Sequence, residues 1–115
     1  MNIEDEECNF CLSNMIGSYT ILYDSYNNIK TYTSECLSTH NKISNILILG
    51  LSSVALLTIE NGEKIVQFAN KCKELNLPID QQYLDYIQND IPYYNIELKE
   101  YVARSINLLK TNKDG

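Results

Sequence analysis

The sequence predicts a single all-α domain, a bundle of four or five helices around one central apolar helix at residues 45–59. Apolar residues before and after this stretch recur at the i, i+3, i+4, i+7 spacing of a helix face. Four Gly and two Pro are too few for a loop-rich sandwich. Because 115 residues suit one domain, we expect it to span residues 1–110, with a frayed tail at residues 111–115.

The central stretch is the most apolar part of the chain, and no formal charge stands between Lys42 and Glu60. It is apolar on nearly every side, which is typical of a helix that others surround. Gly50 and the pair Ser52-Ser53 are small, so neighbouring helices can approach closely there. A membrane span at residues 43–59 is the alternative, but it is at the short edge of the ~20 apolar residues that a bilayer requires. We therefore expect a core helix rather than a membrane helix.

The segment before the central stretch has the periodicity of an amphipathic helix. Its inward positions are expected to be Cys8, Leu12, Met15, Ile16, Tyr19, Leu22, Tyr23 and Tyr26. Residues 18–37 also fit a β-hairpin, because β-branched and aromatic residues favour strands and Asn27-Asn28 favours a turn. We prefer a helix with a break at Asn27-Asn28, followed by a polar loop at residues 38–41.

Three further helices are expected after the central one, at residues 63–75, 81–88 and 95–110. Asn61-Gly62 is a typical helix-breaking pair and separates the first of them from the central helix. Proline disfavours helix at the residue before it, so Pro78 and Pro92 mark the two other breaks. Asp80 is in position to cap the short helix.

The charge excludes some function classes and favours others. The net charge is -6, and the chain has a single Arg, Arg104, and no run of bases. Nucleic-acid binders cluster Lys and Arg against phosphates, so we expect no direct nucleic-acid binding. An acidic surface suits a basic protein partner, although the same charge also keeps a domain soluble.

The sequence contains no motif of a known catalytic site. Gly-rich phosphate loops, G-x-S-x-G and H-E-x-x-H are all absent from it, and the acidic residues are scattered. The single histidine, His40, lies in a polar segment and is expected to be solvated. We expect neither an enzyme nor a bound cofactor.

Four cysteines permit a metal site as an alternative. Cys8 and Cys11, with Cys36 and His40, have the CxxC and CxxxH spacings that zinc sites use. However, Cys8 and Cys11 also share one helix face, and free cysteine is commonly a small core residue. The N-terminus, MNIEDEE, is acidic where a signal peptide is basic. We therefore expect reduced, buried thiols and a cytoplasmic location.

Tyrosines gather late in the chain, where five of the nine lie between residues 83 and 101. Tyrosine is enriched at protein interfaces because it supplies a large contact area with few rotatable bonds. The candidate binding residues are Tyr83, Tyr86, Tyr93 and Tyr94, with Asp85, Asp90 and Glu97 around them. Of these, Tyr86, Tyr93 and Tyr94 are expected to be exposed together.

The leading functional hypothesis is a small acidic intracellular protein-binding module. It would act stoichiometrically as an inhibitor, of the immunity, anti-defence or viral host-modulating type. A zinc-stabilised adaptor that uses the three cysteines and His40 is one alternative, and a small membrane protein spanning residues 43–59 is another. A homodimer with a helical interface is compatible with the first two.

Overall fold

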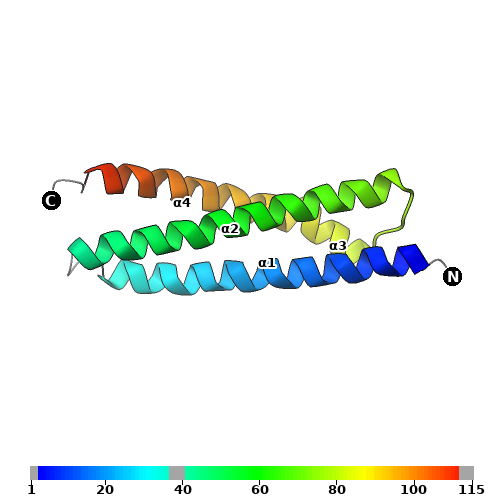
Figure 1. The fold of residues 1–115 in the computed structure, drawn as a ribbon, viewed down its shortest axis with the longest axis horizontal. Coiled ribbons are helices and arrows are strands. Elements are labelled where there is room, and N and C mark those ends of the chain that lie inside the picture. The colour runs from blue at the N-terminus through cyan, green and yellow to red at the C-terminus, as the bar shows by residue number, and fades with distance from the viewer. Residues whose placement is uncertain (1–2, 37–40, 112–115) are drawn as a thin grey trace.

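The computed structural model describes residues 3–36 and 41–111, and three helical rods form a slender bundle of 62 × 20 × 18 Å (Figure 1). Two rods are the single helices α1 (Ile3–Cys36) and α2 (Asn41–Glu74). The third joins α3 (Gln81–Asp85), the π-helical turn η1 (Tyr86–Asp90) and α4 (Ile91–Thr111). The described residues contain no strand, so the all-α prediction is confirmed and the hairpin at residues 18–37 is wrong. Of the expected tail at residues 111–115, Thr111 is the last residue of α4, and residues 112–115 lie outside the described residues.

The three rods alternate in direction. Helices α1 and α4 run the same way and α2 runs against both (Figure 1). Except for Ile59, the buried positions of α2 are separated alternately by three and four residues: Ile48, Leu51, Ala55, Thr58, Gly62, Ile65, Ala69 and Cys72. This interval is the heptad repeat of helices that pack side by side at a shallow angle. Along this row α2 packs against both α1 and α4.

The predicted break at Asn61-Gly62 does not occur, because α2 continues through it. A Cβ atom built on Gly62 would lie 2.7 Å from Asn95 Nδ2 of α4 and 2.9 Å from a ring carbon of Tyr19 of α1. Glycine is therefore present at this position because two neighbouring helices leave no room for a side chain. The expected bundle of four or five helices becomes three rods partly for this reason.

The predicted break at Pro92 is also absent, but the helix adjusts there. Proline in a helix clashes with the carbonyl four residues earlier. The N–H of Ile91 donates to Tyr86 O, five residues back, in the wider π-helical turn η1. This local widening accommodates Pro92 and allows α3 and α4 to form one rod. Asn27-Asn28 likewise lies within the unbroken α1.

The chain does turn at Asn76-Leu77-Pro78, as predicted. Asn76 has a φ of 60°, and Leu77 N–H donates to Cys72 O at 2.9 Å, which is the Schellman arrangement of a helix end. Asn9 of α1 holds the following segment by donating to Pro78 O and accepting from Asp80 N–H. Asp80 occupies the N-cap position of α3, but its side chain makes no capping hydrogen bond with any described residue.

The central apolar stretch is buried on one side only. Its inward residues are covered, but Ile46, Leu49, Leu56 and Leu57 remain 69%, 55%, 53% and 55% exposed. The expectation that helices surround residues 45–59 is therefore wrong for one face. The physical reason is the number of rods: α2 has two neighbours, and two helices cover only part of its circumference.

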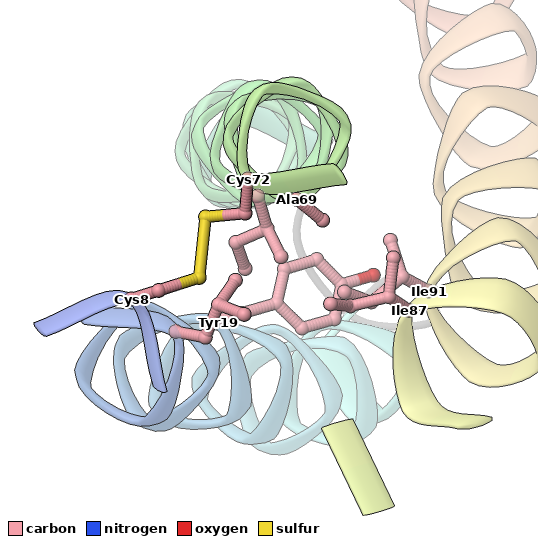
Figure 2. Close-up of a cluster of buried hydrophobic side chains, with 8 residues drawn as sticks. Cys8, Tyr19, Ala69, Cys72, Ile87 and Ile91 are labelled. Carbon is pink, nitrogen blue, oxygen red and sulfur yellow. A yellow bond between two sulfur atoms is a disulfide. The ribbon is translucent and has the colours of Figure 1, made fainter. Parts of the chain in front are cut away.

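One end of the bundle is tied by a disulfide. Cys8 of α1 and Cys72 of α2 are bonded, and both are buried with Tyr19, Ala69, Ile87 and Ile91 (Figure 2). The prediction of a reduced Cys8 is therefore wrong, although its inward position and that of Cys72 are confirmed. The bond joins the two helix ends farthest from the α1–α2 connection. Cys11, expected to be buried, is a free and exposed thiol.

Candidate functional site

The predicted tyrosine surface is only partly exposed. Tyr93 is 69% exposed, whereas Tyr83, Tyr86 and Tyr94 are half-buried against the core cluster that contains Tyr19. The expectation that Tyr86, Tyr93 and Tyr94 are exposed together is thus wrong for two of the three. The residues are close in the sequence, but the rotation of a helix turns Tyr94 inward and leaves Tyr93 outward.

Tyrosine rings instead form a seam between α1 and the third rod. Tyr23 packs on Tyr94 with ring centroids 4.3 Å apart, and Tyr26 meets Tyr101 edge to face at 5.5 Å. Tyr19 meets Tyr86 edge to face at 6.3 Å. Such pairs stabilise a fold by about 0.5–1.5 kcal/mol each beyond the area they bury. Three tyrosines of α1 are therefore matched in order by three tyrosines from the third rod.

The hydroxyl groups of this seam find polar partners across the bundle. Tyr19 donates to Asn95 Oδ1 at 2.8 Å in a buried site, and Asn95 Nδ2 approaches Ile59 O at 3.4 Å. Tyr23 donates to Glu97 Oε2 at 3.0 Å, and Lys30 lies 3.8 Å from the other oxygen of the same carboxylate. Glu97, proposed from the sequence as a binding residue, thus also links α4 to α1.

Burial raises the pKa of several of these tyrosines. Loss of solvent is the main cause for Tyr19, Tyr26 and Tyr86. Burial, followed by the hydrogen bond to Glu97, raises the pKa of Tyr23 to about 12. In each case the phenolate would have to form in an apolar or acidic environment, so the neutral form is favoured.

Alkaline pH should therefore destabilise the fold through these hydroxyls. Below pH about 10 tyrosines are neutral in the folded and unfolded chain, and their full contribution to stability is present. As pH rises from there through the folded pKa of Tyr23, near 12, the unfolded chain loses protons first and stability falls. We expect the ultraviolet tyrosinate titration of the native protein to lag behind that of the urea-denatured chain.

Tyr23→Phe is the matched variant for this titration, because it removes one hydroxyl and keeps the ring against Tyr94. It should remove one late-titrating group and leave the rest of the curve in place. Native and denatured chains that titrate together would contradict the assigned burial.

The two other predicted acids lie on the surface. Asp85 is exposed and accepts a hydrogen bond from Gln81 Nε2 at 2.8 Å, and Asp90 is exposed at the end of η1. With Glu97, whose side chain is 34% exposed, they place negative charge before and after Tyr93. One further exposed apolar residue, Ile96 at 59%, lies one turn after Tyr93 and was not predicted. The sequence does contain a signal for Ile96: Tyr93 and Ile96 are two large residues at i, i+3 spacing, outside the buried face of the helix.

The structure does not bring the predicted zinc ligands together. Cys8 and Cys36 lie near opposite ends of the unbroken α1, about 42 Å apart at a helix rise of about 1.5 Å per residue. One ion cannot bind both, and Cys8 is already bonded to Cys72. His40 lies outside the described residues. No group of three or more metal-binding side chains occurs within the described ranges.

Sequence reasoning missed a second surface, on α2. The exposed residues Ile46, Leu49, Leu56 and Leu57 leave an apolar face, and a cavity of about 580 Å³ lies beside it, lined by Tyr32 and Gly50 among others. The stretch Asn45–Glu74 is also long and apolar enough to span a membrane, with 39% of its apolar window buried. Core helices of soluble proteins meet the same criterion, and this stretch includes the core of the present bundle.

Comparison of the chain with models of protein families, with curated proteins and with solved structures found no match. Any functional conclusion therefore rests on the geometry of the described residues. Two of their solvent-facing surfaces differ in character. One is the surface around Tyr93 and Ile96 on α4, with Asp90 before it and Glu97 after Tyr93. The other is the uncharged apolar face of α2 at residues 45–59.

Proposed function

We propose that this chain is a small, non-enzymatic protein-binding module that acts stoichiometrically by covering a basic surface on a partner protein. The observation that supports this most directly is the pair Tyr93 and Ile96, 69% and 59% exposed on α4, with the exposed Asp90 three residues before Tyr93. A few residues supply most of the binding energy of a protein interface, and tyrosine is enriched among them. An inhibitor of the immunity, anti-defence or viral host-modulating type fits this role.

Rigid support for Tyr93 favours binding. Its ring meets that of Tyr94 at 5.8 Å, and Tyr94 packs on Tyr23 at 4.3 Å, so the exposed ring stands on a fixed base. A side chain held before binding loses less conformational entropy in the complex. The π-helical turn η1 directly precedes α4, the helix of Tyr93, and such turns occur frequently at functional sites.

Charge indicates the chemistry of the partner. Asp85 and Asp90 are exposed before Tyr93 in the same rod. Glu97, after it, is partly exposed beside Lys30, and the chain as a whole carries a net charge of -6. A negative surface accelerates association with a basic partner and repels acidic ones. Binding should accordingly weaken as salt screens the charges.

The cytoplasmic location proposed from the sequence has less support than the binding role. It rests on reduced thiols, whereas disulfides such as Cys8–Cys72 persist mainly in oxidising compartments. The redox state of these two cysteines in protein taken from its native cells, trapped by alkylation before lysis, would decide between the two locations.

The binding role can be tested by cross-linking and affinity capture from native lysate, followed by measurement of the complex with purified partner. Tyr93→Ala should weaken a one-to-one complex by about 2 kcal/mol, roughly thirtyfold in Kd, because a hot-spot ring is lost. Higher salt should weaken the wild-type complex further.

Phe10→Ala is the matched control, since Phe10 is a 70% exposed aromatic residue on a different helix, α1. It should leave the affinity unchanged. A partner that binds Tyr93→Ala and wild-type protein equally well would refute the assigned surface, and recovery of no stoichiometric partner would refute the binding role.

A further inference from the structure

The uncharged face of α2 has a row of four residues whose sizes follow a symmetric order. Ile46, Gly50, Ser53 and Leu57 are all exposed and are separated by four, three and four residues. Alternating intervals of three and four are the spacing at which one helix packs along another. The row reads large, small, small, large, with the small residues at its centre.

This order is the same when read from either end. If two copies of α2 pack antiparallel across a twofold axis between Gly50 and Ser53, Ile46 of one copy faces Leu57 of the other. Gly50 then faces Ser53, so the two backbones can approach closely at the crossing. A symmetric dimer requires such a self-complementary surface, and an unrelated partner helix would not.

Two cavities in the groove between α1 and α2 match the two large residues. The larger, about 580 Å³, is lined by Ile46 with Tyr32 of α1. A smaller one, about 250 Å³, is lined by Leu57 with Leu22 of α1 and also by the polar residues Glu60, Asn61 and Lys64. In the antiparallel arrangement, the second copy's leucine lies at the first cavity and its isoleucine at the second. Each copy therefore offers both the apolar side chains and the hollows beside which they pack.

The centre of this contact is free of charge, and Glu60 and Lys64 lie at its edge, where they form an ion pair within α2. No formal charge occurs from residue 45 to residue 59, so two copies with a net charge of -6 each can meet here without like charges facing each other. The Ser53 hydroxyl donates to Leu49 O at 3.0 Å within its own helix, so covering it leaves no hydrogen bond unmade. A strongly basic partner would find no opposite charge on this stretch.

We propose that a second copy of this chain docks on the exposed face of α2, with the two α2 helices antiparallel. The contact would cover the apolar side chains that the two neighbours of α2 leave in solvent. It goes beyond the proposed function, because neither cavity is lined by a residue of α4, where Tyr93 lies. A dimer of this kind presents two Tyr93 surfaces.

Sedimentation velocity over a concentration series tests the proposal on the full chain. Wild-type protein should sediment with twice the chain mass at high concentration and dissociate on dilution. Ile46→Lys and Leu57→Glu should each weaken the dimer by at least about a hundredfold, since a charge enters an apolar contact twice per dimer. An equal mixture of the two variants should regain the dimer, because the introduced lysine and glutamate then face each other.

Two further variants keep the test independent of folding. A Cβ at Gly50 meets no described atom within 4 Å, so Gly50→Leu should leave the circular dichroism spectrum unchanged and still block the dimer. Ile106→Lys, at a 47% exposed apolar residue of α4, should leave the dimer intact.

A wild-type monomer at every concentration would overturn the proposal, as would dimers that survive Gly50→Leu. Failure of the mixed variants to pair would overturn the antiparallel arrangement. Binding of the wild-type protein to phosphatidylcholine vesicles, lost in Leu57→Glu, would assign this face to a membrane instead.

Discussion

Loss of the Cys8–Cys72 disulfide is expected to lower the free energy of unfolding by roughly 4 kcal/mol. The bond joins residues separated by 64 positions, and breaking it frees a long loop in the unfolded chain. It also ties the open end of the α1–α2 hairpin. The double variant Cys8→Ala/Cys72→Ala should therefore unfold at a much lower urea concentration than the oxidised wild-type protein.

Two comparisons separate the bond from the side chains. Wild-type protein in reductant should approach the double variant, whereas Cys11→Ser, which alters an exposed free thiol, should match the oxidised protein. If oxidised and reduced proteins unfold at the same urea concentration, the bond does not stabilise the fold.

Substitution of Gly62 by alanine is expected to cost roughly 2 kcal/mol of stability. Helix propensity alone predicts the opposite sign, since alanine stabilises a helix interior by about 0.5–1 kcal/mol over glycine. The added methyl would lie within 3 Å of Asn95 and Tyr19, whose hydrogen bond of 2.8 Å joins α4 to α1. Steric overlap at a junction of three rods should outweigh the local gain.

Gly17→Ala provides the matched control, because a Cβ at Gly17 of α1 meets no described atom within 4 Å. It should raise the urea midpoint while Gly62→Ala lowers it. In an Asn95→Ala background, Gly62→Ala should cost less, since one of the two obstructing side chains is gone. Equal effects of the two glycine substitutions would contradict the packing described.

Helical content and most inward positions could be predicted from periodicity, because a repeat near 3.5 residues is set by burial along one face. Tyr19, Ile65 and Leu98 are buried as their spacing indicates. The predicted breaks at Gly62 and Pro92 were wrong for a shared reason. Local propensity considers each residue without its neighbours in space. In the fold, Gly62 is required because two other rods leave no room for a side chain, and Pro92 is accommodated by the widened turn before it.

The candidate site was less predictable than the fold. Spacing along one helix identifies which residues share a face, but not which side chains of another rod will meet them. Tyr94 was therefore expected on the surface and instead packs on Tyr23 of α1. The pairing of Cys8 with Cys72 and the exposed face of α2 depend in the same way on the number and order of the rods.

The odd number of rods has a consequence for anything attached to this chain. Three alternating rods place Ile3 and Thr111 at opposite ends of a bundle whose longest dimension is 62 Å (Figure 1). A hairpin or a four-helix bundle would instead bring its two ends to the same side. Segments fused to the two termini would project in opposite directions, so the bundle would act as a spacer between them.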